Sequence, residues 1–479
     1  KWKARACANG AWIWDSYGYQ TKAVDEDMYN SPVNFRAFRT TMMMAYLRKW
    51  CARQGDVAGA YLEADLKGPP VFIRLPQQLR PDTPAWKNTD DPFVKLVKAL
   101  YGLQRSGFDW AAKLEKALKE QGYNKSHTED GVFYNANATI VVYVDDLVLC
   151  TTRNIAEKAK KDLEGIFPLS FEDMGKFLGV RCHEKFNESP GMTNVRWEQV
   201  HYTKHMIDEF EATQGVVYKT ASPDTRDPAP HANDDQPGVL DGRKWVGSLL
   251  YLSRCTRWDI AHAVGMLARK ASKWTKKEDK ALVRLMGYLK WTMEQGLEWT
   301  INPKDFEENE LVLHMHTDSD LAGEIETAKS TTGFVVALRG RYGTRAILDW
   351  GSKRQTHIAR SSGQAEMQAL VDGLTMSFLF IIMLIEEIAP GLVFRKCVQV
   401  DNDAARLGLG NYRTSAMRIM ARTHRVNLAW LHEMIYETKI FELGRVDTKV
   451  NWANYLTKAE HPGEFARQTQ CVRKLDLEA

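Results

Sequence analysis

The chain has 479 residues, of which 44% are hydrophobic, with 15 Trp, 17 Tyr and 18 Phe. This length is enough for roughly three domains, and the aromatic content excludes a chain that is disordered throughout. The formal net charge is only +4, which excludes a surface that is basic all over, so any surface that binds nucleic acid must be local.

Seven scattered cysteines form no Cys-x-x-Cys motif. Their odd number and spacing predict reduced thiols in an intracellular compartment, and argue against a disulfide frame or a zinc site. The most apolar run, Phe378 to Ile385, is too short to span a bilayer and predicts a buried helix, so we expect no membrane partner. A start at Lys1 without Met, and without a signal peptide before the first motif, is expected of a processed or excised fragment.

Helical and strand-like patterns alternate over the first 180 residues. Helices are predicted at 38–50, 110–121 and 155–167, and strands at 55–62 and 71–75. Two further strands, 139–142 and 147–150, flank Tyr143-Val144-Asp145-Asp146 and predict a hairpin with both carboxylates at its turn. Adjacent carboxylates repel unless a cation lies beside them, so the pair fits two-Mg²⁺ phosphoryl transfer. Taken alone, however, an Asp-Asp turn is more often only a solvated turn.

The middle of the chain changes composition twice. Residues 219–243 are dense in Pro, Asp and Gly, which predicts a long surface connection. A helical region follows, in which apolar residues from Ala281 to Leu289 form one stripe. The basic run from Arg269 to Lys280, with Trp274 inside it, fits a surface that follows a phosphate backbone. It fits a solvated helix face equally well.

Strand patterns dominate from about residue 310. Strands are predicted at 311–317, 332–338 and 345–350, followed by a helix at 362–374 and the apolar helix. A strand at 397–400, another helical segment and a last strand near 440–446 complete the pattern. Three strands followed by helices and further strands predict a compact α/β domain.

Asp56, within Gly55 to Leu62, is the third acid that a two-metal site at the hairpin would need. With this residue, the order of motifs resembles the reverse transcriptase of copia-type LTR retrotransposons. The motifs are Asp56-Val57 with Ala60-Tyr61-Leu62, Leu96 to Leu103, Tyr143 to Asp146, Phe177-Leu178-Gly179, Val246 to Leu252, Arg257 to Ala261 and Tyr288-Leu289-Lys290. The similarity continues into the family's ribonuclease H domain at Thr317 to Gly323, Lys329 to Gly333, Trp350 to Gln355, Ser361 to Glu366 and Asp401-Asn402. Each motif is weak alone, but together they run in one order over nearly the whole chain.

The resemblance implies a mixed α/β (α+β) multidomain fold, a right-hand polymerase with a C-terminal ribonuclease H-like domain. Fingers and palm would occupy residues 1–180. Thumb and connection would occupy 181–309, including the 219–243 linker. The ribonuclease H-like domain would occupy 310–460 and a C-terminal tail 461–479.

The resemblance also assigns the polymerase site. Asp56, Asp145 and Asp146 would be its catalytic acids and metal ligands, with Mg²⁺ as cofactor and Mn²⁺ as a substitute. Tyr61 matches the aromatic gate that excludes a ribonucleotide 2′-OH; without the resemblance it would be a core aromatic on a strand. Lys3 and Arg5 match a basic fingers strand that grips the triphosphate, and their alternative is a solvated strand edge.

In the second domain, Asp318, Glu366 and Asp401 match three catalytic, metal-binding acids of a ribonuclease H. Asp401 alone would also fit a helix N-cap before Ala404-Ala405. The nearby acids Asp320 and Glu324 are expected to be surface charges.

The sequence departs from the family's pattern at three places. Gln104 and Arg105 follow Tyr101-Gly102-Leu103, so the Gln that packs on the nucleotide aligns with Arg105. Either Gln104 substitutes for it or nucleotide handling is altered. Asn454 replaces the fourth ribonuclease H acid and removes a charge from a divalent metal ligand set. Asn9 stands where a Lys is expected.

The predicted function is an RNA-directed DNA polymerase with an attached, weakened ribonuclease H. Its expected partners are an RNA template, a DNA primer, the RNA–DNA hybrid, dNTPs, and the integrase and capsid parts of the same polyprotein. The expected location is a cytoplasmic virus-like particle, with the nucleus as the alternative. A catalytically decayed or domesticated nucleic-acid-binding descendant is the alternative function. A telomerase-like or intron-encoded polymerase is disfavoured by the attached ribonuclease H pattern.

Overall fold

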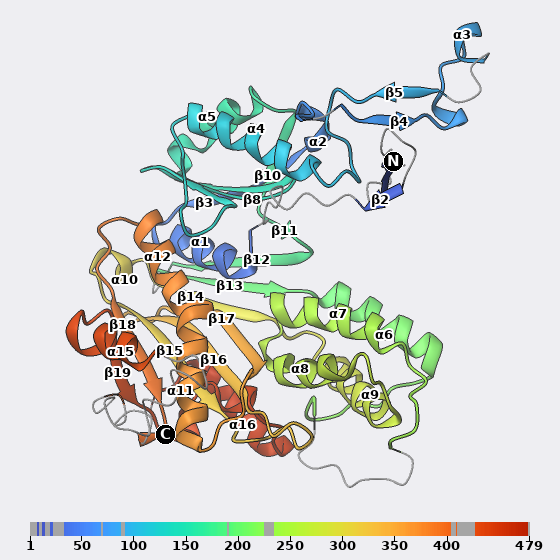
Figure 1. Ribbon diagram of the computed structural model, residues 1–479. Coiled ribbons are helices and arrows are strands. Elements are labelled where there is room, and N and C mark those ends of the chain that lie inside the picture. The colour runs from blue at the N-terminus through green and yellow to red at the C-terminus, as the bar shows by residue number, and fades with distance from the viewer. Residues whose placement is uncertain are drawn as a thin grey trace. The chain divides into compact units, whose positions relative to one another are not determined.

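A computed structural model describes residues 7–477 except 9–11, 15–19, 23–32, 69, 88–91, 189–190, 225–233, 404–408 and 410–426. The chain divides into two compact units (Figure 1). The first unit contains Lys1–Asn34 and Trp50–Met174, and the second contains Phe35–Lys49 and Gly175–Ala479. The mixed α/β class predicted from the sequence is confirmed.

The first unit is built on a six-stranded antiparallel sheet in the order β10-β3-β9-β8-β7-β6. Its strands are β3 (Cys51–Val57), β6 (Asn124–Lys125), β7 (Val132–Tyr134), β8 (Ala138–Tyr143), β9 (Asp146–Thr151) and β10 (Leu169–Asp173). Helices α2 (Ala60–Glu63), α4 (Ser106–Glu120) and α5 (Arg153–Glu164) complete the layer, with α4 and α5 on one face of the sheet (Figure 1). Trp110 and Leu114 of α4 join Ile140 and Leu149 of the sheet in one apolar core, which fixes the sheet edge against the helix.

Two small ribbons extend the first unit. One pairs β1 (Trp12–Trp14) with β2 (Gln20–Lys22). The other pairs β4 (Phe72–Arg74) with β5 (Phe93–Lys95), and between them the chain forms η2 (Gln77–Leu79) and α3 (Pro84–Lys87).

The strand predicted at 55–62 differs from the structure. The strand begins earlier, as β3, and ends at Val57, because Gly59 takes the left-handed conformation with φ 70° and starts the short helix α2. Asp56 therefore lies near the end of its strand and not near its start. Tyr61 lies on a helix, so placing it on a strand was wrong.

The second unit contains a nine-stranded sheet in the order β11-β12-β13-β14-β17-β16-β15-β18-β19. Its strands are β11 (Lys176–Phe177), β12 (Val180–Asn187), β13 (Met192–Glu198), β14 (Leu297–Ile301), β15 (Leu311–Ser319), β16 (Thr331–Gly340), β17 (Arg345–Arg354), β18 (Arg395–Val400) and β19 (Glu442–Arg445). β15 pairs antiparallel with β16 and parallel with β18. The strands predicted beyond residue 310 are thereby confirmed, four of them with wider bounds and the last, β19, with narrower bounds than the predicted 440–446.

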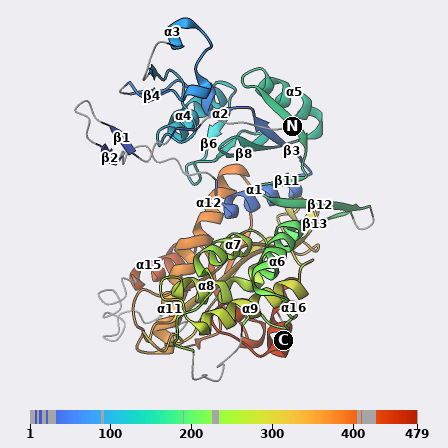
Figure 2. The same ribbon diagram turned by 90° about the vertical axis from the view of Figure 1, so that its right-hand side faces the viewer.

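Helices cover this sheet and form a separate bundle beside it (Figure 2). They are α1 (Phe35–Leu47), α6 (Val200–Gln214), α7 (Gly242–Cys255), η3 (Trp258–Ile260), α8 (Ala261–Lys270), α9 (Lys276–Trp291), α10 (Lys304–Glu307), α11 (Ser362–Gly373), η4 (Leu374–Phe378), α12 (Leu379–Ile388), α15 (Leu428–His432), η5 (Glu433–Glu437), η6 (Thr448–Val450), η7 (Asn454–Leu456) and α16 (Pro462–Lys474). The predicted tail 461–479 contains α16, whose Phe465 packs edge-on against Tyr288 of α9.

The apolar run predicted to form a buried helix lies within a longer one. Helices α11, η4 and α12 are continuous from Ser362 to Ile388, and these 27 residues are long and apolar enough to cross a membrane by length and composition. In the window that meets this test 61% of the residues are buried, and the core helix of a soluble protein meets the same test. The expected absence of a membrane partner stays a prediction.

Helix α1 belongs to the second unit although it precedes β3 of the first unit in the sequence. Arg39, which is 4% exposed, forms an ion pair with Asp349 at 3.0 Å and donates to the carbonyl oxygen of Leu348 at 2.6 Å. Its guanidinium also lies 4.2 Å from the centre of the Trp350 ring. The second unit is therefore not a continuous stretch of sequence. The boundaries at 180, 309 and 460, which separate fingers and palm, thumb and connection, the ribonuclease H-like domain and the tail, stay predictions.

Removing the charge of Arg39 should destabilise the second unit. In Arg39→Ala the carboxylate of Asp349 loses its buried partner, so we expect the free energy of unfolding to fall by about 3 kcal/mol. Urea unfolding followed by hydrogen exchange at β17 measures this. Arg341→Ala is the matched control, because Arg341 pairs with Glu310 while 70% exposed, and its loss should cost under about 1 kcal/mol. A shift in Arg39→Ala no larger than in this control would show that the buried pair does not hold α1.

Candidate active sites

The hairpin between β8 and β9 brings the first three predicted acids to one edge of the sheet. Asp56 of β3 lies directly opposite Asp146 of β9 in the antiparallel register. The amide of Val57 donates to the carbonyl oxygen of Asp145 at 2.9 Å. Asp56, Asp145 and Asp146 thus share the end of a strand pair, as the sequence predicted for the hairpin turn.

The turn that presents Asp145 has an unusual backbone. Val144 has φ 59°, a left-handed conformation that is costly for a β-branched residue, on the order of 1–2 kcal/mol. The indole of Trp110 in α4 donates to the carbonyl oxygen of Val144 at 2.7 Å. A buried helix residue therefore holds the strained turn in place, an arrangement that fits a site where a side chain must be aimed.

Electrostatics show that these groups are close together. Burial raises the pKa of Asp146, and the charges of Asp145 and Asp56 raise it further. Burial also raises the pKa of Tyr61, with the charge of Asp145 next. Because the charges of Asp145 and Asp56 disfavour ionisation of Asp146, a divalent cation at this edge would relieve the repulsion.

Tyr61 lies where a gate residue would be expected. It is half-buried on α2, and its ring centre is 4.6 Å from that of Tyr101. The ring packs against the apolar core of the first unit without being enclosed in it, so the alternative of a core aromatic keeps its packing role but not its place on a strand. Its role toward a nucleotide stays a prediction.

Gln104 and Arg105 occupy different environments. Gln104 is exposed, whereas the Arg105 guanidinium donates to the fully buried carboxylate of Asp109 at 2.9 Å. Arg105 also packs against Gly68, where a Cβ would meet its Nη1 at 2.3 Å. Arg105 thus anchors the first turn of α4, and Gln104 is the freer of the two to meet a nucleotide. Lys3, Arg5 and Asn9 lie outside the described residues.

The second group of acids lies at the edge of the large sheet. Asp318 ends β15, Glu366 lies on α11 and Asp401 follows β18. Extending the parallel register from His316 and Gln399 by two residues places Asp318 beside Asp401. One ligand atom from each of the three acids lies within 4.8 Å of the others. In the part of the chain that the structure describes, no other group of three His, Cys, Asp or Glu residues meets that criterion.

The donor set of this second site fits a divalent cation. Asp318 and Glu366 are each 5% exposed. One oxygen of Glu366 accepts from the amide of Ser319 at 3.3 Å, while its other oxygen, Oε2, is buried without a hydrogen-bond partner among the described residues. Burial, followed by the charges of its carboxylate neighbours, raises the pKa of both Glu366 and Asp318. Carboxylate oxygens that are buried, close together and incompletely bonded are the ligands that Mg²⁺ and Mn²⁺ prefer.

Asn454 lies beside this site on η7, which packs against β15 and β16. The single hydroxyl proton of Thr457 is within reach of two acceptors, a carboxylate oxygen of Asp318 and the carbonyl oxygen of Asn454. Gly333 of β16 permits this close packing, because a Cβ there would meet the carbonyl oxygen of Ala453 at 2.8 Å. The side-chain oxygen of Asn454 is buried and has no hydrogen-bond partner within the described ranges. Its position agrees with a fourth ligand, and its role stays a prediction.

Two expectations about nearby acids were wrong. Glu324 is 8% exposed and forms an ion pair with Arg354 at 3.1 Å, so it is not a surface charge. Asp320 is half-buried and accepts a hydrogen bond from the backbone of Thr331. Both acids hold the loop after β15. Thr457 was missed altogether, because a single Thr carries no signal of a carboxylate partner 139 residues away in the sequence.

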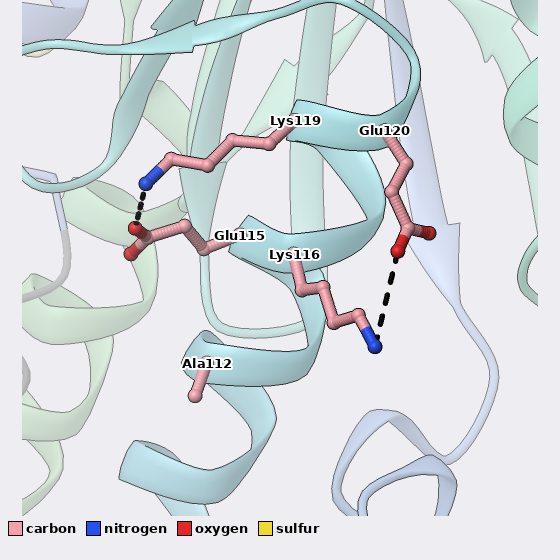
Figure 3. Close-up of a pocket in the computed structure, with 5 residues that line it drawn as sticks. All are labelled: Ala112, Glu115, Lys116, Lys119 and Glu120. Carbon is pink, nitrogen blue, oxygen red and sulfur yellow. Dashed lines mark hydrogen bonds and ion pairs between the residues drawn. The ribbon is translucent and has the colours of Figure 1, made fainter.

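A shallow hollow on the exposed side of α4 is not part of either site. Ala112, Glu115, Lys116, Lys119 and Glu120 line it (Figure 3). Glu115 pairs with Lys119 at 2.6 Å, and Lys116 with Glu120 at 3.8 Å. These i,i+4 pairs satisfy each other on a solvated helix face.

Comparison with known proteins finds similarity to reverse transcriptases and to retrotransposon Pol polyproteins. A family model described as "Reverse transcriptase (RNA-dependent DNA polymerase)" matches residues 1–223. The Pol polyprotein of transposon TNT 1-94 from Nicotiana tabacum is 26% identical over 472 residues, 93% of this chain and 32% of that protein. The chain is thus similar to the Pol polyproteins of copia-type retrotransposons over most of its length.

The Pol polyprotein of transposon RE2 from Arabidopsis thaliana is also 26% identical, over 85% of this chain and 26% of that protein. The chain thus spans about a quarter to a third of the length of these Pol polyproteins. Among solved structures, the prototype foamy virus protease–reverse transcriptase is 12% identical, covering 94% of this chain and 50% of that chain with a TM-score of 0.20.

Neutralising one acid of the second site should stabilise the metal-free chain. A carboxyl group whose pKa is higher in the folded state loses stability as pH rises above its unfolded pKa. We therefore expect Glu366→Gln to be as stable as the parent near pH 5, and more stable by on the order of 2 kcal/mol at pH 8 in EDTA. Thermal unfolding across pH 5–8 measures this difference.

The control for that titration is Glu386→Gln on the same long helix, where the exposed carboxylate pairs with Lys396. Its stability should follow that of the parent at every pH, because Glu366 is unchanged in it. If Glu366→Gln is less stable than the parent at pH 8, the three acids do not repel one another in the folded protein.

Proposed function

We propose that this chain is an RNA-directed DNA polymerase with an attached ribonuclease H, which copies retrotransposon RNA into DNA. The observation that supports the proposal is that three acids gather at one place in each unit, in a chain that is similar to Pol polyproteins. Substrates would be an RNA template, a DNA primer and dNTPs for one group, and an RNA–DNA hybrid for the other. Under this proposal the first unit supplies fingers and palm, and thumb and connection precede the ribonuclease H-like part.

At the first site, Asp56 and Asp145 would hold Mg²⁺, with Mn²⁺ as a substitute. Bound metal would acidify the primer 3′-OH and neutralise the triphosphate. The chain's own contribution is positioning: the register of β3 and β9 aligns the acids, and Trp110 fixes the turn. Tyr61, beside Asp145, would restrict the sugar to one without a 2′-OH, and Gln104 would contact the nucleotide.

At the second site, Asp318, Glu366 and Asp401 would hold the metal for hydrolysis of RNA, with Asn454 as a neutral neighbour. A neutral ligand holds Mg²⁺ less firmly than a carboxylate, so this activity would be weak. We further propose that the chain works beside integrase and capsid parts of one polyprotein, in a cytoplasmic particle.

Removing one hairpin acid should separate chemistry from binding. Asp145→Asn should lower primer extension on an RNA template by at least about 100-fold, because a lost metal ligand disables the site. Binding of primer–template should change little, since phosphate contacts dominate affinity. Asp130→Asn is the matched control, because Asp130 is an exposed acid of the same unit, paired with Lys125 at 2.8 Å.

The same assay decides between the enzyme and the decayed, nucleic-acid-binding alternative. Primer extension by the parent chain in Mg²⁺ or Mn²⁺ supports the polymerase. Tight template binding without extension in either metal supports the non-catalytic descendant.

Restoring a carboxylate beside the second site should raise ribonuclease H activity. Asn454→Asp adds an anionic neighbour to Asp318 and Glu366, so cleavage of a labelled RNA–DNA hybrid should increase, most in Mg²⁺. The same change should lower the thermal stability of the chain in EDTA, because it buries a further like charge. Primer extension is the internal control and should not respond. Equal cleavage at every metal concentration, with equal stability in EDTA, would show that Asn454 does not face the acids.

A further inference from the structure

The ribbon formed by β4 and β5 has an exposed face on which aromatic and basic side chains alternate. In its antiparallel register Phe72 lies opposite Lys95, and Arg74 lies opposite Phe93. Directly opposite residues point to the same side of a two-stranded ribbon. Phe72 is 57% exposed and Phe93 is 62% exposed, and both basic residues are exposed as well.

The opposite face of the same ribbon behaves differently. Ile73 and Val94 form the middle cross-strand pair of the ribbon, and both are half-buried. The ribbon thus turns its aliphatic residues inward and its aromatic rings outward, the reverse of what burial of the largest apolar surfaces would favour. The rings are not needed for the core of the first unit, whose buried cluster does not include them.

The charge on the outer face of this ribbon is positive. Arg74 and Lys95 are the charged residues of β4 and β5, and neither strand contains an acid. A local excess of positive charge with exposed rings is the composition of surfaces that bind single-stranded nucleic acid. Each ring offers a plane to an unpaired base, and each neighbouring cation offers a partner to a phosphate.

We propose that the outer face of the β4–β5 ribbon, made of Phe72, Arg74, Phe93 and Lys95, binds single-stranded nucleic acid. Under the proposed function this strand would be the unpaired template ahead of the primer, and only that assignment rests on the polymerase. Phe72 and Phe93 stack on bases, while Arg74 and Lys95 contact phosphates. The ribbon is shown with α3 at its far end in Figure 1.

The test measures binding by fluorescence anisotropy with the full chain carrying Asp145→Asn, so that no primer extension occurs. The probes are a single-stranded RNA, a primer–template with a 5′ template overhang, and the same duplex with blunt ends. Phe72→Ala/Phe93→Ala should weaken binding of both probes with unpaired bases by at least about 20-fold, since stacking contributes roughly 1–3 kcal/mol per base. Blunt duplex binding should change by less than about twofold.

The two cations should act differently from the rings. Arg74→Ala/Lys95→Ala should reduce the slope of log affinity against log salt by about 1.4, the value for two phosphate contacts on a single strand. The aromatic variant should leave that slope unchanged. Phe72→Tyr/Phe93→Tyr keeps both rings and should bind like the parent, which separates loss of stacking from a damaged fold.

The matched control is Lys185→Ala/Phe186→Ala on the β12–β13 ribbon of the second unit, where Phe186 is 63% exposed beside an exposed Lys. This pair should bind all probes like the parent. Unchanged single-strand binding in Phe72→Ala/Phe93→Ala would overturn the proposal, as would equal losses on blunt duplex or no single-strand binding by the parent. A change in sedimentation coefficient with unchanged affinity would overturn it in favour of a protein contact.

Failure of the polymerase gives a different result. The parent chain, with Asp145 intact, could bind single strands through the ribbon and still extend no primer in Mg²⁺ or Mn²⁺. That result would overturn the proposed function but support the proposal for the ribbon.

Discussion

Repulsion between carboxylates is the constraint on which both candidate sites depend. Each site gathers three acids at the edge of a sheet, and burial in the second site removes the water that would screen them. Carboxylates can stay this close only because the surrounding fold is stable enough to offset their repulsion. In the first unit that frame is the β3–β9 register with Trp110 behind the turn. In the second it is the pairing of β15 with two neighbours and the close packing of η7 on Gly333.

The second unit depends on a helix, α1, that lies in the sequence between the two segments of the first unit. Arg39 of α1 bonds the carbonyl oxygens of Leu348 and Arg254 and the carboxylate of Asp349, which also accepts from Ser377. A buried cation with several acceptors is stable only as a complete set. A cut of the chain at residue 174 would therefore remove from the second unit one of its own buried helices.

Charge is distributed so that one chain can present acids and still attract a polyanion. The net charge of the whole chain is small, and the acids that gather at the two sites would repel phosphate without metal. Basic residues are therefore useful only where they are local, as on the β4–β5 ribbon. Rings beside these cations add contacts that salt does not screen.

Much of this protein was determined by its sequence alone. The Tyr143-Val144-Asp145-Asp146 hairpin and the strands beyond residue 310 were predicted from local patterns, because alternation and turn residues act over short stretches. The acids Asp318, Glu366 and Asp401 were named only by the resemblance to a ribonuclease H domain, and the structure brings them together. The tertiary structure decided what depends on contacts between distant residues. The strand β3 ends before Gly59, and Tyr61 lies on the helix that follows. Arg105 forms an ion pair with Asp109, and Glu324 is buried in an ion pair with Arg354. The partner of a buried charge is chosen by packing across the fold, and no local pattern in the sequence records that choice.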